Sequence, residues 1–274
     1  MLICGKFRFS LSRPLIMGIV NVTPDSFSDG GKFASSNAAV EHGMRLVEQG
    51  ADILDIGGES SRPGAQAVPL EEELDRVIPV VEALAKMDVP VSVDTVKVEV
   101  MKEAVGAGAS LINDINALQG VDPDFLINSD VAICLMHKQG EPMTMQLAPS
   151  YNDVLADVIQ FLERRVEAVV AKGISRERLV IDPGFGFGKT LEQNLELLRH
   201  LESFKTLGLP ILAGLSRKSM LGEITGKPVD ERIHASIAAS LMAVGRGASI
   251  VRVHDAGAMK DALSVFNRVE GKAA

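Results

Sequence analysis

Residues 53–64 read ILDIGGESSRPG, a short apolar run that ends in glycines, serines and a proline. The nearly continuous apolar run at 53–57 is typical of a parallel strand, because helices cover both faces of such a sheet. The glycine, serine and proline residues behind it are typical of a loop. A segment with the helical period follows from Glu71. Strand, loop and helix in this order predict one β–α unit.

The same unit recurs along the chain. Eight strands are predicted, at residues 15–21, 53–57, 89–94, 111–115, 131–136, 179–183, 210–214 and 249–254. Helical periodicity is seen between them, for example at residues 71–87, 154–173 and 191–201. Eight such units in 274 residues predict an α/β fold, the (β/α)8 TIM barrel, with a doubly wound sheet as the alternative.

The remaining organisation of the chain is simple. Alternating residues from Leu2 to Phe9 predict a short N-terminal β-hairpin in front of the barrel. Gly50, Gly173 and Gly245 mark predicted helix ends. No linker or change of composition divides the chain, so we expect a single domain over residues 1–274.

Composition narrows the class of protein. The chain is 46% hydrophobic and 23% charged with a net charge of −8, which is typical of a soluble globular protein and does not favour nucleic acid or an anionic membrane as partner. No apolar run approaches the ~20 residues of a membrane span, and the first residues lack the pattern of a signal peptide. We therefore expect a cytoplasmic protein. Cys4 and Cys134 are expected to be buried free thiols.

Polar residues gather at the carboxyl ends of the predicted strands. Side chains alternate between the two faces of a strand, and this parity places the polar residues on the same inward face as apolar residues earlier in each strand. The set is Asn21, Asp55, Asp94, Asn113, Asp182, Arg252 and His254. Burying so many polar groups at one barrel mouth costs several kcal/mol unless they have partners. The pattern predicts a site for a polar ligand at the end where barrel enzymes carry their chemistry.

Individual residues in this pattern have simpler explanations. Asp55 or Asp114 taken alone is as well explained by capping as by function. Ser216 in GLSRK lacks the final glycine of a nucleophile elbow and is interpreted as structural. The four histidines other than His254 make no zinc spacing and are interpreted as helix or loop residues; they are His42, His137, His200 and His234.

The glycine-rich stretch DPGFGFGKT, residues 182–190, fits neither common nucleotide motif. Pro183 stands where a P-loop needs glycine, and Lys189 stands where the dinucleotide fingerprint needs it. Lys218, Arg252 and His254 nevertheless follow or end the last two strands, where barrels often capture phosphate. A solvated Arg62 and a ligand-binding Arg62 remain equally favoured.

Seven motifs, in this order, closely resemble the dihydropteroate synthase family. They are NVTPDSFSDGG, DIGGESSRPG, SVDT, NDI, DPGFGFGK, GLSRKSMLG and RVHD, and they cover nearly the whole chain. The resemblance implies a barrel, usually homodimeric, that condenses 6-hydroxymethyl-7,8-dihydropterin diphosphate with p-aminobenzoate. The implied products are 7,8-dihydropteroate, a folate precursor, and pyrophosphate.

The resemblance also implies roles for particular residues. The catalytic set would be Asp94, Lys218, Arg252 and His254. The pterin would be bound by Asp94, Asn113, Ile115, Met136, Asp182, Phe187, Gly214, Lys218 and Arg252. The diphosphate would be bound by Asn21, Ser61, Arg62, Arg252 and His254, with Asn21 as a ligand of Mg²⁺. The p-aminobenzoate pocket would comprise Phe27, Ser61, Arg62, Pro63, Phe187, Lys218 and Ser219.

The implied mechanism is SN1-like. The bond to diphosphate breaks first, the arylamine traps the pterin cation, and the loops after the first two strands close over the site to exclude water. Ser61 replaces the threonine of many family members and keeps the hydroxyl, and we expect sensitivity to sulfonamides. Two other functions are less favoured. Methyl transfer from methyltetrahydrofolate to a corrinoid protein needs neither a diphosphate-binding Asn21 and His254 nor the SSRPG loop, and the retention of both loops and all basic groups argues against pterin binding without catalysis.

Overall fold

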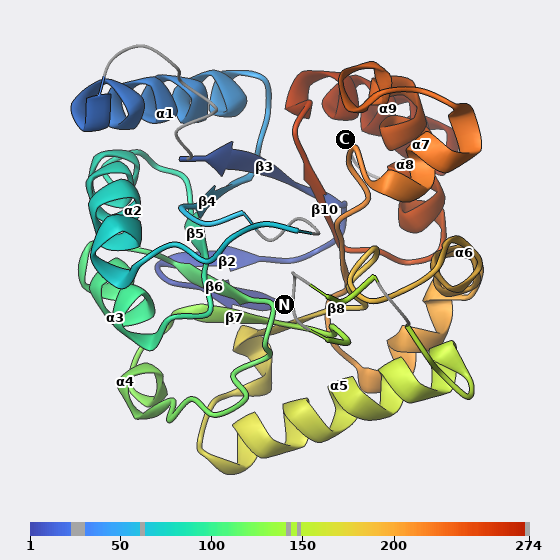
Figure 1. Cartoon of the computed structure of the whole chain (residues 1–274), viewed down its shortest axis with the longest axis horizontal. Coiled ribbons are helices and arrows are strands. Elements are labelled where there is room, and N and C mark those ends of the chain that lie inside the picture. Colours follow the sequence, from blue (N-terminus) through green and yellow to red (C-terminus); the bar gives the residue numbers. More distant parts are fainter. Residues whose placement is uncertain (23–30, 61–63, 141–143, 147–148, 272–274) are drawn as a thin grey trace.

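The strands of the chain form two sheets. The computed structural model describes residues 1–22, 31–60, 64–140, 144–146 and 149–271 (Figure 1). The strands are β1 (Leu2–Cys4), β2 (Phe7–Phe9), β3 (Leu15–Asn21), β4 (Ile53–Gly57), β5 (Val91–Asp94), β6 (Leu111–Asp114), β7 (Ala132–Met136), β8 (Leu179–Asp182), β9 (Leu212–Ala213) and β10 (Ile250–Val253). β1 and β2 form an antiparallel pair, and β3 to β10 form the main sheet.

The main sheet is an eight-stranded parallel barrel. Its hydrogen-bonded order is β8-β7-β6-β5-β4-β3-β10-β9. The two ends of this row meet through a parallel bridge between Ile181 and Ile211, where the Ile181 amide donates to the Pro210 carbonyl at 3.0 Å. The predicted TIM barrel is confirmed, and the doubly wound alternative is wrong because the sheet closes on itself.

Helices surround the barrel (Figure 1). The α-helices are α1 (Gly31–Glu48), α2 (Leu70–Leu84), α3 (Val98–Gly106), α4 (Asp124–Ile127), α5 (Val154–Ala171), α6 (Leu191–Arg199), α7 (Ser219–Thr225), α8 (Ile233–Gly245) and α9 (Ala256–Val269). Short 3₁₀ turns are η2 (Arg176–Arg178), η3 (Leu201–Leu207) and η4 (Val229–Glu231). No helix in these described segments is long and apolar enough to cross a membrane.

Local sequence explains where several helices begin. Asp153 caps α5 by accepting a hydrogen bond from the Ala156 amide at 3.0 Å. Thr190 and Gln193 form a reciprocal capping box at the start of α6. The strand predicted at residues 210–214 is shortened to β9, because Pro210 has no N–H to donate to a neighbouring strand.

The barrel has two separate hydrophobic cores, as strand parity predicts. The inner core contains Met17, Ile53, Leu111 and Val180, which point into the barrel. Residues one position away along the strands belong to the outer core between the sheet and the helices; they include Ile16, Leu54, Ile112, Ile181 and Val251. The inward rows therefore lead to the polar residues at the carboxyl ends of the strands.

The N-terminal hairpin closes the opposite end of the barrel. Leu2 and Cys4 are fully buried in the inner core. The Cys4 thiol donates to the Ser110 carbonyl at 3.3 Å, and the Gly5 amide donates to the Asp130 carbonyl at 2.8 Å. Ser110 directly precedes β6 and Asp130 lies two residues before β7, so the hairpin covers the amino-terminal end of the sheet. The carboxyl-terminal end is left for a ligand, and both cysteines are free and buried as predicted.

Leu2→Ala is expected to lower the free energy of unfolding by about 2–4 kcal/mol, because it leaves a cavity in the inner core. Urea unfolding measures this change. The control is Met44→Ala on α1, a residue that is 45% exposed and whose loss is expected to change stability by only about 0.5 kcal/mol. Equal effects of the two substitutions would show that the hairpin does not contribute to the barrel core.

Candidate active site

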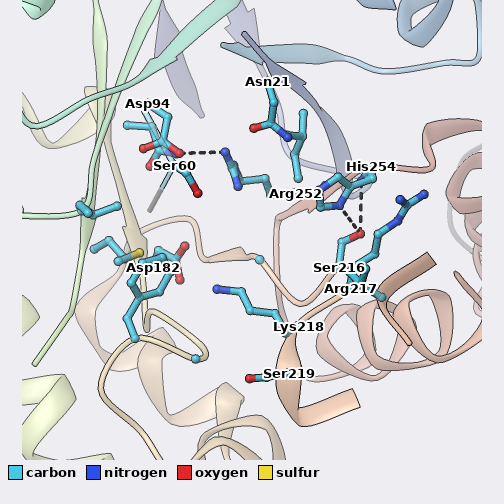
Figure 2. A pocket seen from close by; sticks show the side chains of 18 of the residues that line it. Asn21, Ser60, Asp94, Asp182, Ser216, Arg217, Lys218, Ser219, Arg252 and His254 are labelled. Carbon is cyan, nitrogen blue, oxygen red and sulfur yellow. Dashed lines mark hydrogen bonds and ion pairs between the residues drawn. The ribbon is translucent and has the colours of Figure 1, made fainter. Parts of the chain in front are cut away.

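A cavity of about 430 Å³ opens at the carboxyl ends of the strands (Figure 2). Every described residue to which the family resemblance assigns a role lines it: Asn21, Asp94, Asn113, Ile115, Met136, Asp182, Phe187, Gly214, Lys218, Ser219, Arg252 and His254. They come from β3, β5, β6, β7, β8, β10, the loops that follow the strands and the first residue of α7. Phe27, Ser61, Arg62 and Pro63 lie outside the described residues.

One side of the cavity is built around the guanidinium of Arg252. Its Nε donates to Asp55 Oδ2 at 2.5 Å, and its Nη2 donates to Asp94 Oδ2 at 2.8 Å. The two carboxylates raise the pKa of Arg252 above its ordinary value, so this side chain stays charged although it is largely buried. Burial raises the pKa of Asp94 to about 7, and the nearby Arg252 opposes that rise. One cation is therefore held between two carboxylates from adjacent strands.

Asn113 lies next to this ion pair and presents an unpaired acceptor. Its Nδ2 donates to Asp55 Oδ2 at 3.2 Å. Its Oδ1 is buried and has no hydrogen-bond partner in the described part of the chain. Since buried polar atoms are nearly always paired, this oxygen indicates a place for a ligand N–H.

The other side of the cavity is formed by Asp182 and Lys218. Asp182 Oδ1 accepts the Gly184 amide at 2.7 Å, and burial raises the pKa of this carboxyl. Burial lowers the pKa of Lys218 to about 8, and Asp182 partly opposes that effect. Figure 2 shows Lys218 extending toward Asp182 across the cavity. The Lys218 ammonium also lies 4.1 Å from the centroid of the Phe187 ring, a cation–π contact.

The loop between β8 and α6 is held in place by close backbone packing. Gly184 and Gly188 have φ angles of 70° and 63°, which glycine adopts without strain. A Cβ atom at Gly184 would lie 1.8 Å from the His137 carbonyl oxygen, and one at Gly188 would lie 2.2 Å from that of Gln139. These glycines are therefore needed for the loop to pack on the residues after β7, and the loop in turn supplies the Phe187 wall.

The buried Lys189 holds the same loop by hydrogen bonds to its backbone carbonyl groups. Lys189 Nζ contacts His137 Nδ1 at 3.0 Å and donates to the carbonyls of Gly184 and Phe187 at 2.7 and 3.0 Å. Burial lowers the pKa of Lys189 to about 7 and that of His137 to about 3. The lysine of this stretch therefore binds the protein's own carbonyl groups, in place of the phosphate that a P-loop lysine would bind.

Ser216 lies in the cavity wall, so its interpretation as merely structural is incomplete. Its Oγ lies 2.9 Å from His254 Nδ1 and accepts the His254 amide at 3.2 Å (Figure 2). Arg217 between the two cavity residues has a φ of 58° and is fixed by a two-pronged ion pair with Asp255, at 2.7 and 3.2 Å. The turn thus directs both Ser216 and Lys218 to the cavity. Their spacing of two residues in the sequence is consistent with side chains on the same side of the backbone.

The comparison with known proteins agrees with this geometry. The family described as "Pterin binding enzyme" matches residues 17–254. The chain belongs to this pterin-binding enzyme family. It is 50% identical over 260 residues to the dihydropteroate synthase of Haemophilus influenzae, which covers 93% of this chain and 94% of that protein.

Two solved structures of the same family are closely similar. The dihydropteroate synthase of Burkholderia cenocepacia complexed with 7,8-dihydropteroate is 49% identical, with a TM-score of 0.90 over 98% of this chain and 96% of that one. The Yersinia pestis enzyme in a sulfonamide drug complex is 46% identical, with a TM-score of 0.92 over 98% and 99%. Because both alignments cover nearly the whole of each chain, the agreement extends to the fold as a whole.

The two aspartates left open by the sequence are now distinguished. Asp114 is a capping residue, because its two oxygens accept the amides of Asn116 and Leu118, each at 2.8 Å. Asp55 is fully buried beneath the cavity and bonded to Arg252. Parity already separates them, since Asp55 lies on an inward row and Asp114 does not. Other lining residues carry no signal in the sequence beyond their position in loops; they include Glu59, Met145, Val229 and Arg232.

The buried His137 predicts a pH dependence of stability. Its pKa falls from 6.5 to about 3 on folding, so the unfolded chain binds more protons in this window. The free energy of unfolding is therefore expected to fall as the pH drops below 6.5 toward 3, with this residue contributing up to about 1.4 kcal/mol per pH unit. His137→Gln keeps an acceptor for Lys189 but does not titrate, so urea unfolding across this range should show a shallower decline. Parallel curves for the two proteins would contradict the assignment.

Proposed function

We propose that this chain is a transferase of folate biosynthesis that condenses 6-hydroxymethyl-7,8-dihydropterin diphosphate with p-aminobenzoate. The observation that carries the proposal is the pairing of a hydrogen-bonding cavity floor with a cationic rim in a chain of this family. Asp182 and Asn113 offer acceptors within the cavity, whereas Lys218, Arg252 and His254 offer donors. A flat heterocycle with a phosphorylated tail fits both parts.

The floor suits the edge of a pterin. The 2-amino group and N3–H of a pterin present adjacent donors, which a carboxylate such as Asp182 accepts together. The unpaired Asn113 Oδ1 takes a further N–H, and the Lys218 ammonium suits the ring oxygen or nitrogen acceptors. The walls of this subsite are Ile115, Met136, Phe187 and Gly214.

The rim suits the diphosphate and its departure. The C–O bond between the pterin methylene carbon and the diphosphate breaks, and pyrophosphate leaves with the electron pair. Arg252 and His254 stabilise the departing anion, and the Asp94 carboxylate stabilises the cation left on the pterin. The arylamine nitrogen then attacks the methylene carbon and loses a proton. This SN1-like path requires no strong general base.

The residues of the cavity fit a magnesium ion that is held mainly by substrate. No group of three or more His, Cys, Asp or Glu side chains suited to a metal occurs in the described segments. Asn21 lines the cavity with an amide oxygen, a ligand that Mg²⁺ accepts alongside phosphate oxygens and water. When bound, the ion would withdraw negative charge from the leaving pyrophosphate. Asn21 would hold the ion, and the diphosphate would supply further oxygen ligands.

The second substrate would bind beside the pterin. Phe187, Lys218 and Ser219 contribute to this part of the cavity. We assign Phe27, Ser61, Arg62 and Pro63 to the same pocket, with Ser61 and Arg62 also reaching the diphosphate, from the family motifs alone. Loop closure over the substrates belongs to the same proposal. A relative binds a sulfonamide drug, which supports competition by sulfonamides at this pocket.

The domain count, cellular compartment and oligomeric state follow from the same family assignment. We propose one pterin-binding barrel domain over residues 1–274, acting as a cytoplasmic homodimer. Exposed apolar side chains on α7, α8 and α9, namely Ile224, Met242 and Val265, support a surface for a second copy.

Two competing functions are less consistent with the cavity. A methyl-transferring pterin barrel needs no diphosphate site, yet Asn21, Arg252 and His254 all line this cavity. A pterin-binding protein without catalysis needs no cationic rim either. Both alternatives lead to the same experiment, because neither releases pyrophosphate.

The test mixes the purified chain with the pterin diphosphate, p-aminobenzoate and Mg²⁺. We expect 7,8-dihydropteroate and pyrophosphate in equal amounts, and the loss of both when EDTA removes the metal. Chromatography of the pteridine product and a pyrophosphate assay give independent readouts. A folded protein that binds the pterin but forms no product would favour binding without catalysis.

Asp182→Asn is expected to weaken pterin binding by about 1–3 kcal/mol, because the amide replaces one acceptor oxygen with a donor. Calorimetric titration with the pterin diphosphate measures the change. Asp130→Asn is the control, since Asp130 pairs with Arg8 at the far end of the barrel. Equal affinities of wild type and Asp182→Asn would remove Asp182 from the pterin subsite.

A further inference from the structure

Asp55 lies under the cavity and accepts hydrogen bonds from three different strands. Its Oδ1 accepts the Ser92 hydroxyl at 2.5 Å. Its Oδ2 accepts Arg252 Nε at 2.5 Å and Asn113 Nδ2 at 3.2 Å. Asp55 is fully buried and does not line the cavity, so it acts on a ligand only through these neighbours.

The contact with Asn113 has a chemical consequence. The amide of an asparagine has a donor end and an acceptor end, and a half-turn of the side chain exchanges them. Arg252 and Ser92 both donate to the Asp55 carboxylate, so Asp55 acts as an acceptor. The NH₂ end of Asn113 must then face Asp55, and Oδ1 is left buried without a partner in the described part of the chain.

We propose that Asp55 is a positioning residue that fixes the Asn113 amide, so that this point of the cavity selects a ligand N–H over an acceptor. The inference rests on the proposed pterin site and explains part of its selectivity. A site built to pair a ligand N–H rejects an analogue that lacks it, because the protein acceptor then stays buried and unpaired.

A purely structural role for Asp55 makes a different prediction. If Asp55 only holds Arg252, its loss changes the affinity for any anionic ligand but does not change the preference between ring edges. The ratio of affinities for two uncharged rings therefore separates the roles. Pterin and lumazine are suitable probes, because lumazine has a carbonyl where pterin has its 2-amino group, and the second N–H of that group is the donor that we assign to Asn113 Oδ1.

The central variant is Asp55→Ala. Asparagine is less suitable at this position, because its oxygen would still accept from both Arg252 and Asn113. With alanine the amide of Asn113 is free to turn and pair with either ring. We expect the preference for pterin over lumazine, measured by calorimetry, to fall by roughly tenfold or more.

A double variant tests the cause. In Asp55→Ala combined with Asn113→Asp, the carboxylate introduced at position 113 presents an acceptor to the ligand in either orientation and restores the net charge. We expect it to recover the preference for pterin to within about threefold of wild type. The matched control is Asp52→Ala, which removes an arginine-paired carboxylate just before the same strand, at the opposite end of the barrel. The control is expected to keep the wild-type ratio.

The outcomes separate this inference from the proposed function. A wild-type chain that neither binds pterin nor forms dihydropteroate would overturn both. A functional wild type with an unchanged ratio in Asp55→Ala, or with no recovery in the double variant, would overturn the role of Asp55 alone. Circular dichroism establishes folding, and if Asp55→Ala does not fold, the same ratio is measured in Asp55→Ser, which lacks the carboxylate that holds the Asn113 amide and is expected to show the same fall.

Discussion

The ion pair of Arg252 with Asp55 and Asp94 is the interaction on which the mouth of the barrel depends. It connects the last strand, β10, with β4 and β5, across nearly two hundred residues of sequence. Moving a guanidinium and two carboxylates out of water is costly, and only close, directional contacts compensate for that cost. In the order of the sheet β10 pairs with β3, and β4 and β5 follow, so the curvature of the barrel brings the Arg252 side chain across the mouth to Asp55 and Asp94.

The two ends of the barrel differ in composition and in function. The amino-terminal half is apolar and sealed by Leu2 and Cys4 of the hairpin. The carboxyl-terminal half contains charged and amide groups that gain little for stability by being there. Such a distribution is typical of a barrel in which one end stabilises the fold and the other end carries the chemistry.

Much of this organisation could be predicted from the sequence, because it depends on local periodicity. The bounds of β3 and β4 agree with prediction, and parity correctly places Met17 inside the barrel and Val251 outside. The cavity residues follow from the same rule. Parity says which way a side chain points, and it says nothing about which distant group it meets.

The features that sequence could not supply are contacts between separate segments. Lys189 binds carbonyls of its own loop and the His137 ring, although its motif resembles a phosphate loop. Ser216 meets His254 next to a left-handed turn at Arg217, and Asp255 from a separate segment holds that turn. These pairings depend on three-dimensional distances that neither composition nor spacing determines.

The distribution of charge in the mouth matches the proposed reaction. Asp55, Asp94 and Asp182 supply three carboxylates, whereas Arg252 and Lys218 are the cations that contact or face them. The carboxylates thus lie at the floor and under it, whereas Arg252 lines the cavity with His254 and Asn21 beside it (Figure 2). A reaction that leaves a cation on a pterin and releases pyrophosphate separates charge in the same sense. Because fixed charges need no reorganisation as the bond breaks, the barrel mouth itself stabilises that separation.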